Sequence, residues 1–344
     1  MLRRLTGSFV TVLCVCAIAG CGPSPGSPVN RLGDEIIVCG QLFHTGAPVV
    51  TWLDPGGYDA YRVEPKFQPA GTSASRPASE SAPLVTYGSW RYPLPPGIAD
   101  RIRERGWRLD ELQRVVDQFV IHYDVCGTSR QCFKVLHDMR DLSVQFMLDI
   151  DGTIYQTLDL KERAWHAGTA NSRSVGVEIA NIGAYPDTSV LDKWYQRDKT
   201  GRLRITLPAE MGDGGVRTKG FVGYPARPGL FRGRIQGREL VQYDYTNEQY
   251  ESLIKLTAAL CRIFPNLRCD APRDRQGEII DHVLTDAQQK AYRGLLGHWH
   301  ITAQKVDPGP AFDWFRVING ARRYLGQPPL PAPKPDAASL ALAP

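Results

Sequence analysis

The sequence of 344 residues has no hydrophobic run long enough to cross a bilayer as a helix. The apolar stretch Phe9–Ala19 is shorter than the about 20 residues that a membrane-spanning helix needs. Because Arg3 and Arg4 precede it, the segment is typical of an export signal that is removed from the mature chain. We therefore expect residues 1–20 to be a signal peptide.

The sequence also lacks a large excess of charge of one sign. It has 41 basic and 36 acidic side chains, a formal charge of +5, and loss of Arg3 and Arg4 leaves +3. This near balance gives no support for nucleic-acid binding, which requires a clustered basic face. No internal repeat is evident. The length and an apolar content of 42% predict one substantial core with smaller attachments.

The residues around Cys21 resemble a bacterial lipobox. Small residues of the run Ala17–Gly20 fit a signal peptidase, and Cys21 would carry the lipid. Residues 21–33 then form a flexible tether, and diacyl-glyceryl and amide-linked chains would hold the protein on the membrane. We expect a lipid-anchored protein of the cell envelope, on the periplasmic face of the outer membrane if the cell is Gram-negative. An ordinary secretory signal that happens to contain a cysteine is the alternative.

Five cysteines remain after removal of the signal and lipidation of Cys21, an odd number. Their spacing suggests two local disulfides, Cys126–Cys132 and Cys261–Cys269, with Cys39 left over. The alternative is that all five are buried thiols.

The chain divides by composition into several parts. Residues 34–66 alternate like short strands and predict a small β element, and residues 67–85 are a Ser/Pro-rich linker. The main domain then covers 86–326, with a long insertion rich in Gly, Arg and Pro at about 184–243. The Pro- and Ala-rich tail, 327–344, is predicted to be disordered.

Within the main domain, periodicity predicts helices and strands in alternation. Thr246 and Gln249 form a capping box for a helix that ends before Pro265. The predicted helices are 109–116, 132–139, 246–264 and 285–292, and the predicted strands are 119–124, 144–150, 153–157 and 174–182. This order implies an α/β fold, a mixed β-sheet flanked by α-helices.

Three metal-binding side chains, His122, His298 and Asp307, are widely separated in the sequence. The helical HExxH spacing of many zinc enzymes is not used, so the ligands must converge from separate elements. Two histidines and one aspartate leave a fourth position open, which is typical of catalytic rather than structural Zn²⁺.

Four motifs in register together resemble the zinc-dependent N-acetylmuramoyl-L-alanine amidases. That family shares its fold with phage lysozyme-type amidases and peptidoglycan recognition proteins. The resemblance covers roughly residues 115–320. Its motifs are Phe119–Asp124, Arg163–Gly168, Asn171–Glu178 and Lys305–Trp314.

The resemblance implies a role for individual residues. His122, His298 and Asp307 match the metal ligands, and Glu178 matches the catalytic glutamate, which transfers protons between the attacking water and the leaving amine. Lys305 shares a face with Asp307 in an extended segment, so its ammonium can stabilise the oxyanion.

His166 and Asn171 match a loop that borders the substrate groove in relatives, so they are predicted to bind substrate. The spacing of Cys126 and Cys132 is similar to that of a disulfide in peptidoglycan recognition proteins. This chain also departs from the family. The loop between His298 and Asp307 is one residue shorter, and His300 stands where relatives often have aspartate. His300 is either a spare ligand or a residue with a supporting or surface role.

The predicted function is zinc-dependent hydrolysis of the amide between N-acetylmuramic acid and L-alanine in peptidoglycan or muropeptides. We expect a monomer. Two alternatives stay open: a peptidoglycan-binding lipoprotein without hydrolysis, and zinc chemistry on another amide. Non-catalytic recognition proteins of this fold typically lack a metal ligand, whereas His122, His298 and Asp307 are all present here.

Overall fold

The computed structural model describes residues 25–62, 64, 66–67, 86–91, 94 and 97–333. The chain up to Leu32 is one unit, whose described part contains a turn, and Gly33 onward is a second unit. The predicted signal peptide, Cys21, most of the linker and the end of the tail lie outside the described residues. Among the described helices, none combines the length and apolar character needed to cross a bilayer.

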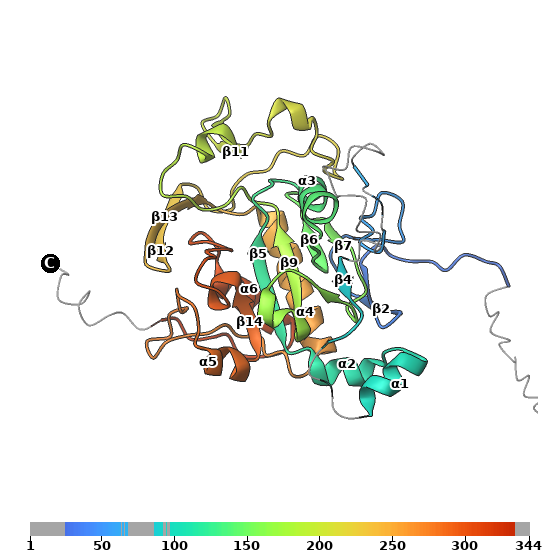
Figure 1. Ribbon diagram of the computed structural model, residues 1–344. Coiled ribbons are helices and arrows are strands. Elements are labelled where there is room, and N and C mark those ends of the chain that lie inside the picture. The colour runs from blue at the N-terminus through green and yellow to red at the C-terminus, as the bar shows by residue number, and fades with distance from the viewer. Residues whose placement is uncertain are drawn as a thin grey trace, which may run out of the picture. The chain divides into compact units, whose positions relative to one another are not determined.

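A six-stranded mixed sheet forms the centre of the second unit (Figure 1). Its order is β14 (Gly294–Gly297), β5 (Gln118–Tyr123), β9 (Ser174–Ile179), β6 (Phe146–Leu148), β7 (Ile154–Gln156) and β3 (Val49–Thr51). The first four strands are parallel, β7 runs antiparallel to β6, and β3 is parallel to β7. The predicted mixed sheet flanked by helices is confirmed.

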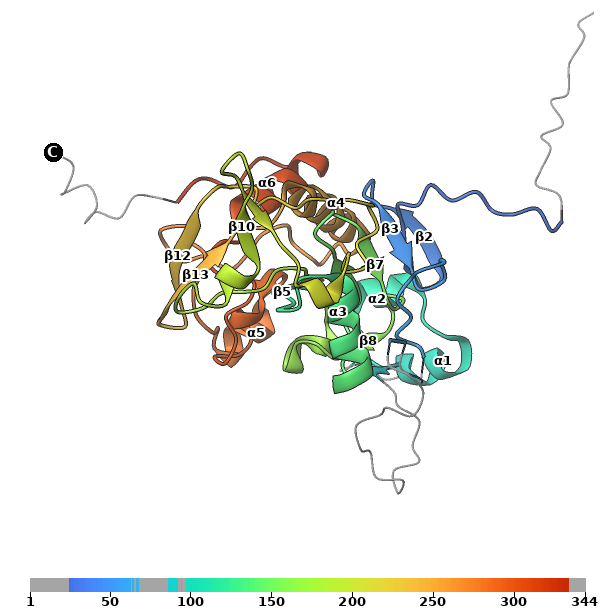
Figure 2. The ribbon, with the colours of Figure 1, turned by 90° about the horizontal axis from the view of Figure 1, so that it is seen from above.

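Helices cover both faces of this sheet. Helices α4 (Asn247–Ile263) and α6 (Trp314–Tyr324) lie on one face, and α3 (Ser129–Phe133) with its π-helical continuation η1 (Lys134–Met139) lies on the other (Figure 2). Because side chains alternate along a strand, Ile121 and Val177 enter the core beneath α4 and α6. His122 and Glu178, one residue further on, therefore point toward the α3 face.

Helix α4 begins where the sequence predicts. The Thr246 hydroxyl accepts a hydrogen bond from the Gln249 amide at 3.0 Å, and the Gln249 side chain accepts one from the Thr246 amide at 2.9 Å. This capping box satisfies two amides that the first turn leaves without partners. The Gln249 side chain also donates to the carbonyl of Ala180 after β9, which fixes α4 to the end of that strand.

The predicted small β element is not separate from the main domain. Strands β1 (Glu35–Val38) and β2 (Gln41–His44) form a hairpin, but β3 extends the main sheet. Ile36 and Val38 are fully buried in the main core. The sequence could not reveal this, because pairing of β3 with β7 joins residues about a hundred positions apart in the chain.

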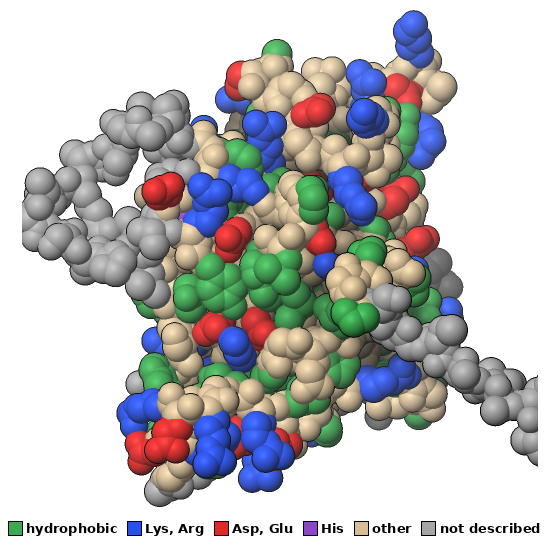
Figure 3. All heavy atoms as spheres, turned by 90° about the vertical axis from the view of Figure 1, so that its right-hand side faces the viewer, with side chains coloured by type: hydrophobic (Ala, Val, Ile, Leu, Met, Phe, Trp, Pro, Cys, Tyr) green, Lys and Arg blue, Asp and Glu red, His purple; other side chains and the backbone are tan. Residues whose placement is uncertain are grey.

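The remaining elements are short and surround the sheet. The insertion contains two hairpins: β10 (Tyr195–Arg197) with β11 (Leu203–Ile205), and β12 (Leu230–Ile235) with β13 (Arg238–Tyr243). The other described strands and α-helices are β4 (Tyr87–Gly88), β8 (Arg163–Ala164), α1 (Ile98–Arg105), α2 (Leu109–Val115) and α5 (Asp286–Ala291). On the face shown in Figure 3, basic and acidic side chains are interspersed around a group of hydrophobic ones.

The five described cysteines are free thiols in this structure. Cys126 and Cys132 nevertheless contact each other through their side chains, and so do Cys261 and Cys269. Each pair is therefore placed for the disulfide that the sequence suggests, and the two disulfides stay predictions.

Asp149, next to the end of β6, makes stability depend on pH. Its Oδ1 accepts a hydrogen bond from the Ile150 amide, but its Oδ2 has no partner among the described residues. Burial raises the pKa of this carboxyl to about 8, against 3.8 for an ordinary aspartate. At pH values between 3.8 and about 8, the Asp149 carboxyl is protonated in the folded chain but ionised in the unfolded chain. Asp149 therefore destabilises the fold increasingly as pH rises from about 4 to about 8.

We expect Asp149→Asn to raise the melting temperature at pH 8, with a gain of about 1 kcal/mol or more, and to change it little at pH 4. Thermal denaturation at the two pH values measures this. Asp286→Asn, at an exposed position, is the control. A gain of equal size at both pH values would show that Asp149 is already ionised in the fold.

Candidate metal centre and catalytic cleft

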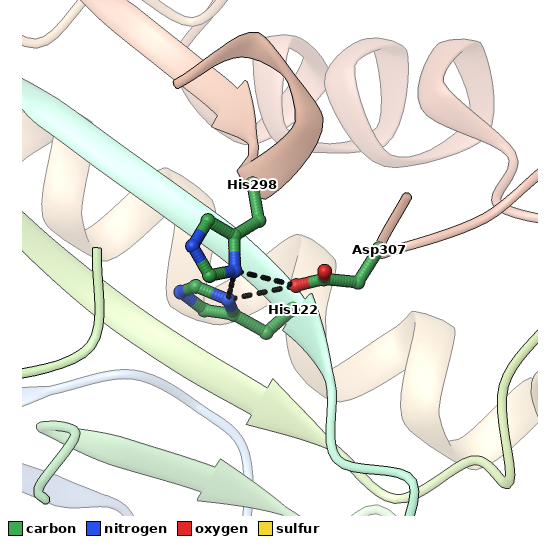
Figure 4. A group of neighbouring side chains, drawn as sticks. All are labelled: His122, His298 and Asp307. Carbon is green, nitrogen blue, oxygen red and sulfur yellow. Dashed lines mark hydrogen bonds and ion pairs between the residues drawn. The ribbon is translucent and has the colours of Figure 1, made fainter. Parts of the chain in front are cut away.

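The three predicted metal ligands meet at the carboxyl ends of the parallel strands β14 and β5 (Figure 4). His122 is the fifth residue of β5, and its strand neighbour in β9 is Glu178. His298 begins a short 3-10 turn directly after β14. Asp307 follows nine positions later. Ligands commonly bind at this edge of open α/β sheets.

The geometry of the three side chains fits a metal ion. His122 Nδ1 lies 3.0 Å from His298 Nδ1 and 2.9 Å from Asp307 Oδ2, and His298 Nδ1 lies 3.0 Å from the same oxygen. Tetrahedral zinc ligands at bond lengths of about 2.0 Å lie about 3.3 Å apart, so little movement is needed. All three residues are buried, and the described chain holds one other group of this kind, Asp34, Glu35 and His44.

The ionisation states of His122 and Asp307 favour metal binding. Burial lowers the pKa of His122 to about 4, so its imidazole is neutral at physiological pH. Burial alone would raise the pKa of Asp307, but the neighbouring His298 and the hydrogen bonds from both imidazoles hold it below its usual range. Neutral imidazole and ionised carboxylate are the forms that bind metals.

Hydrogen bonds to the next residue hold Asp307 in place. The Pro308 carbonyl accepts a hydrogen bond from the Tyr245 hydroxyl at 2.6 Å and one from the Gln242 side chain at 3.1 Å. Gly309 has φ of +87°, and a Cβ there would overlap the Gln242 amide. The Pro-Gly turn is therefore required for Gln242 to reach the backbone beside the ligand.

His166 lies directly behind His122. Its Nδ1 is 3.0 Å from His122 Nε2, and its Nε2 is 3.4 Å from the Ser174 hydroxyl. If His122 Nδ1 binds a metal ion, the ring proton of the neutral imidazole lies on Nε2 and can be donated to His166 Nδ1. A Cβ on Gly176 would lie 2.5 Å from the His166 ring, so this glycine of β9 makes room for the contact.

Asn171 supports the loop that carries His166. Its Oδ1 accepts hydrogen bonds from the backbone amides of His166 at 3.2 Å and Ala167 at 2.6 Å. The side-chain oxygen is thus used within the protein. His166 lines the cleft, and its predicted contact with substrate stays a prediction, as does that of Asn171.

His300 is outside the metal group, which corrects the suggestion of a spare ligand. Its Nδ1 accepts a hydrogen bond from the Gly297 amide at 2.9 Å, and its Nε2 donates to the Ile280 carbonyl at 2.7 Å. Both ring nitrogens are therefore used by the backbone. Because the side chain is fully buried, His300 positions the turn that begins at His298.

A cleft of about 470 Å³ opens over the three residues, lined also by Glu178, His166 and Lys305. Burial raises the pKa of Glu178 well above its ordinary value, and the charge of Asp307 adds to this while Lys305 opposes it. Lys305 itself is exposed. The cleft therefore places a carboxyl group with a raised pKa and an exposed lysine side chain beside the candidate metal centre.

Residues 112–310, more than half of the chain, match the family model for N-acetylmuramoyl-L-alanine amidase. The chain belongs to this family. The predicted family, the fold class and the amidase activity are thereby confirmed. A comparison with curated protein sequences finds none that matches the chain.

Several solved structures are similar to parts of this amidase, and AmiD and LysC among them are named as amidases. They include a selenomethionine derivative of AmpD, with a TM-score of 0.29 and 18% identity over 60% of this chain and 84% of that one. AmiD from E. coli, bound to anhydro-N-acetylmuramic acid-L-Ala-D-γ-Glu-L-Lys, has a TM-score of 0.32 and 18% identity. The match covers 60% of this chain and 57% of AmiD. LysC from Clostridium intestinale URNW has a TM-score of 0.32 and 16% identity. The match covers 63% of this chain and 89% of LysC.

The contact between His166 and His122 gives a prediction for metal affinity. We expect His166→Ala to weaken zinc binding by about 10- to 100-fold, because groups that orient a metal ligand have effects of this size. Competition with a chelator measures it. His166→Gln keeps an acceptor oxygen and is expected to restore part of the loss. Unchanged affinity in both variants would mean that His166 does not orient the ligand.

Proposed function

We propose that this amidase is a zinc enzyme whose metal ligands are His122, His298 and Asp307. The observation that carries the proposal is the mutual spacing of 2.9–3.0 Å between two imidazole nitrogens and one carboxylate oxygen, all in buried residues. Three protein ligands leave a position open, as in catalytic zinc sites. A zinc ion bound there supplies Lewis acidity, which polarises a carbonyl group and lowers the pKa of water.

Glu178 is proposed as the residue that transfers protons. As a carboxylate it takes a proton from the attacking water, and as a carboxyl it returns one to the nitrogen of the leaving L-alanine. Its raised pKa supports the second role, because the protonated form then persists to higher pH. Its place in β9, opposite His122 in β5, brings it to the metal centre on a rigid element.

Lys305 is proposed to stabilise the oxyanion. It lines the same cleft, two residues before Asp307. Its Nζ can donate a hydrogen bond to the carbonyl oxygen of the scissile amide as that oxygen gains negative charge. A preformed donor of this kind contributes most when it faces the charge that develops in the transition state.

The substrate class follows from the family: the enzyme hydrolyses the amide bond between N-acetylmuramic acid and L-alanine. The direct test incubates the full chain with muramyl peptides, with and without a chelator, and measures new amino termini. We expect free L-alanine amino termini that disappear with chelator and return with zinc. Cleavage that is indifferent to chelator would contradict the zinc proposal, and absence of cleavage would favour a peptidoglycan-binding role.

We further propose that a lipid on Cys21 anchors the amidase in the cell envelope. The support is the lipobox-like run before Cys21, which lies outside the described residues, and the Gly-, Pro- and Ser-rich tether that follows it. Incorporation of labelled palmitate by the wild type, and none by Cys21→Ser, is the expected result. Equal labelling of both would remove Cys21 as the lipid site.

A further inference from the structure

A second cavity, of about 580 Å³, opens beside the catalytic cleft. Val125, Cys126 and Val135 line both, so the two cavities adjoin. One wall of the second cavity comes from α3 and its continuation η1. The other comes from the insertion, residues 184–243, through residues that include Trp194 and Glu210.

The insertion is packed closely against the loop and helix that follow β5. A Cβ on Gly127, which has φ of +77°, would overlap the Trp194 ring. A Cβ on Gly214 would lie 2.6 Å from Thr128 Cγ2, and one on Gly215 would lie 2.5 Å from the side chain of Arg130. The close packing therefore depends on Gly127 in the loop after β5 and on Gly214 and Gly215 in the insertion. Through these contacts the insertion forms a packed wall of the second cavity.

The charges in this cavity favour an anionic ligand. Arg130 and Lys134 line it from the helical side, and Glu210 is the acidic residue of its lining. Neither cation forms an ion pair with a described residue; the Arg130 guanidinium lies 5.3 Å from the centre of the Phe67 ring. A muropeptide has two unlike halves. Its N-acetylated sugars carry no charge, whereas its peptide carries free carboxylates.

We propose that the insertion and α3 form a subsite for the stem peptide, in which Arg130 and Lys134 bind its carboxylates. The inference rests on the proposed function, because it takes the scissile amide to lie at His122, His298 and Asp307. From there an extended peptide of three residues covers about 10 Å, and Cys126, which lines both cavities, marks the side from which it would enter the second one. The insertion would then determine which peptides the enzyme accepts.

The test compares two substrates: N-acetylmuramoyl-L-alanyl-γ-D-glutamyl-L-lysine, and the same molecule with both peptide carboxylates converted to amides. For the wild type we expect a lower KM for the acid, with a difference that shrinks at high salt. Arg130→Gln and Lys134→Gln should each raise the KM of the acid by up to about fivefold, as expected for exposed ion pairs, and leave its kcat unchanged. The amide should respond little to either change.

Lys290→Gln is the matched control, because Lys290 is an exposed cation lining a different cavity. Equal KM changes for acid and amide, or none, would overturn the inference. A KM increase in the variants that depends on the length of the glycan, and not on the charge of the peptide, would also overturn it, because the cavity would then bind sugar.

If the wild type hydrolyses neither substrate, the proposed function fails. Calorimetric titration with the free tripeptide and its amide then decides the subsite alone: preference for the acid, lost in both variants, supports it, and equal binding rejects it.

Discussion

Replacing His122 with alanine is expected to remove tight zinc binding and reduce hydrolysis of muramyl peptides to the background rate. In the proposed zinc site His122 supplies one of three protein ligands, and its side chain is buried. Removing a ligand should weaken zinc binding by more than the roughly 10- to 100-fold loss that follows removal of a residue that only orients a ligand. Metal analysis of the purified chain, together with the amino-terminus assay, measures both effects.

The control for this variant is His282→Ala. His282 is exposed and pairs with Asp281 at 2.9 Å, away from the cleft lining. It should keep zinc and activity, which separates loss of a ligand from loss of any histidine. A His122→Ala protein that stays fully loaded with zinc, while folded by circular dichroism, would show that the ligand set is wrong.

Replacing Glu178 with glutamine is expected to have the second large effect, of a different kind. The variant should retain zinc, because Glu178 is outside the group of three ligand atoms. Its kcat should fall by about 10²- to 10⁴-fold, since an amide of the same size can neither take nor return a proton. Zinc content and turnover of muramyl peptides, measured on one preparation, test the two statements together.

Glu162→Gln is the matched control for Glu178. Burial also raises the pKa of Glu162, to about 7, but it is not among the residues that line the catalytic cleft. Its hydrogen bond from the Tyr61 hydroxyl lies elsewhere in the fold. If Glu178→Gln turned over substrate at the wild-type rate, the proton would be transferred by another group, and Glu178 would have no catalytic role.

Much of what places the site could be predicted from the sequence, because the signals are local. Strand β5 has a buried apolar run directly before His122, and β9 has the same pattern around Glu178. Helix α4 begins at a capping box that can be read from Thr246 and Gln249. In each case the residues whose pattern predicts the helix or strand lie in that element or directly next to it.

Other features depend on contacts between distant segments, so local patterns did not predict them. Strand β14, directly before His298, is only Gly-Leu-Leu-Gly, too short for a period to be recognised. The role of His300 is determined by backbone groups at Gly297 and Ile280. The contact of His166 with His122 likewise appears only in the fold, although Gly176 inside an apolar strand was a signal of close approach.

The most direct test of a catalytic zinc ion held by two imidazoles and one carboxylate is zinc X-ray absorption spectroscopy on the purified full chain. We expect one zinc per chain with only nitrogen and oxygen neighbours at about 2.0–2.1 Å, two of them imidazoles, and no sulfur shell. A sulfur neighbour at about 2.3 Å would place the metal on cysteines instead. That result would contradict the site formed by His122, His298 and Asp307.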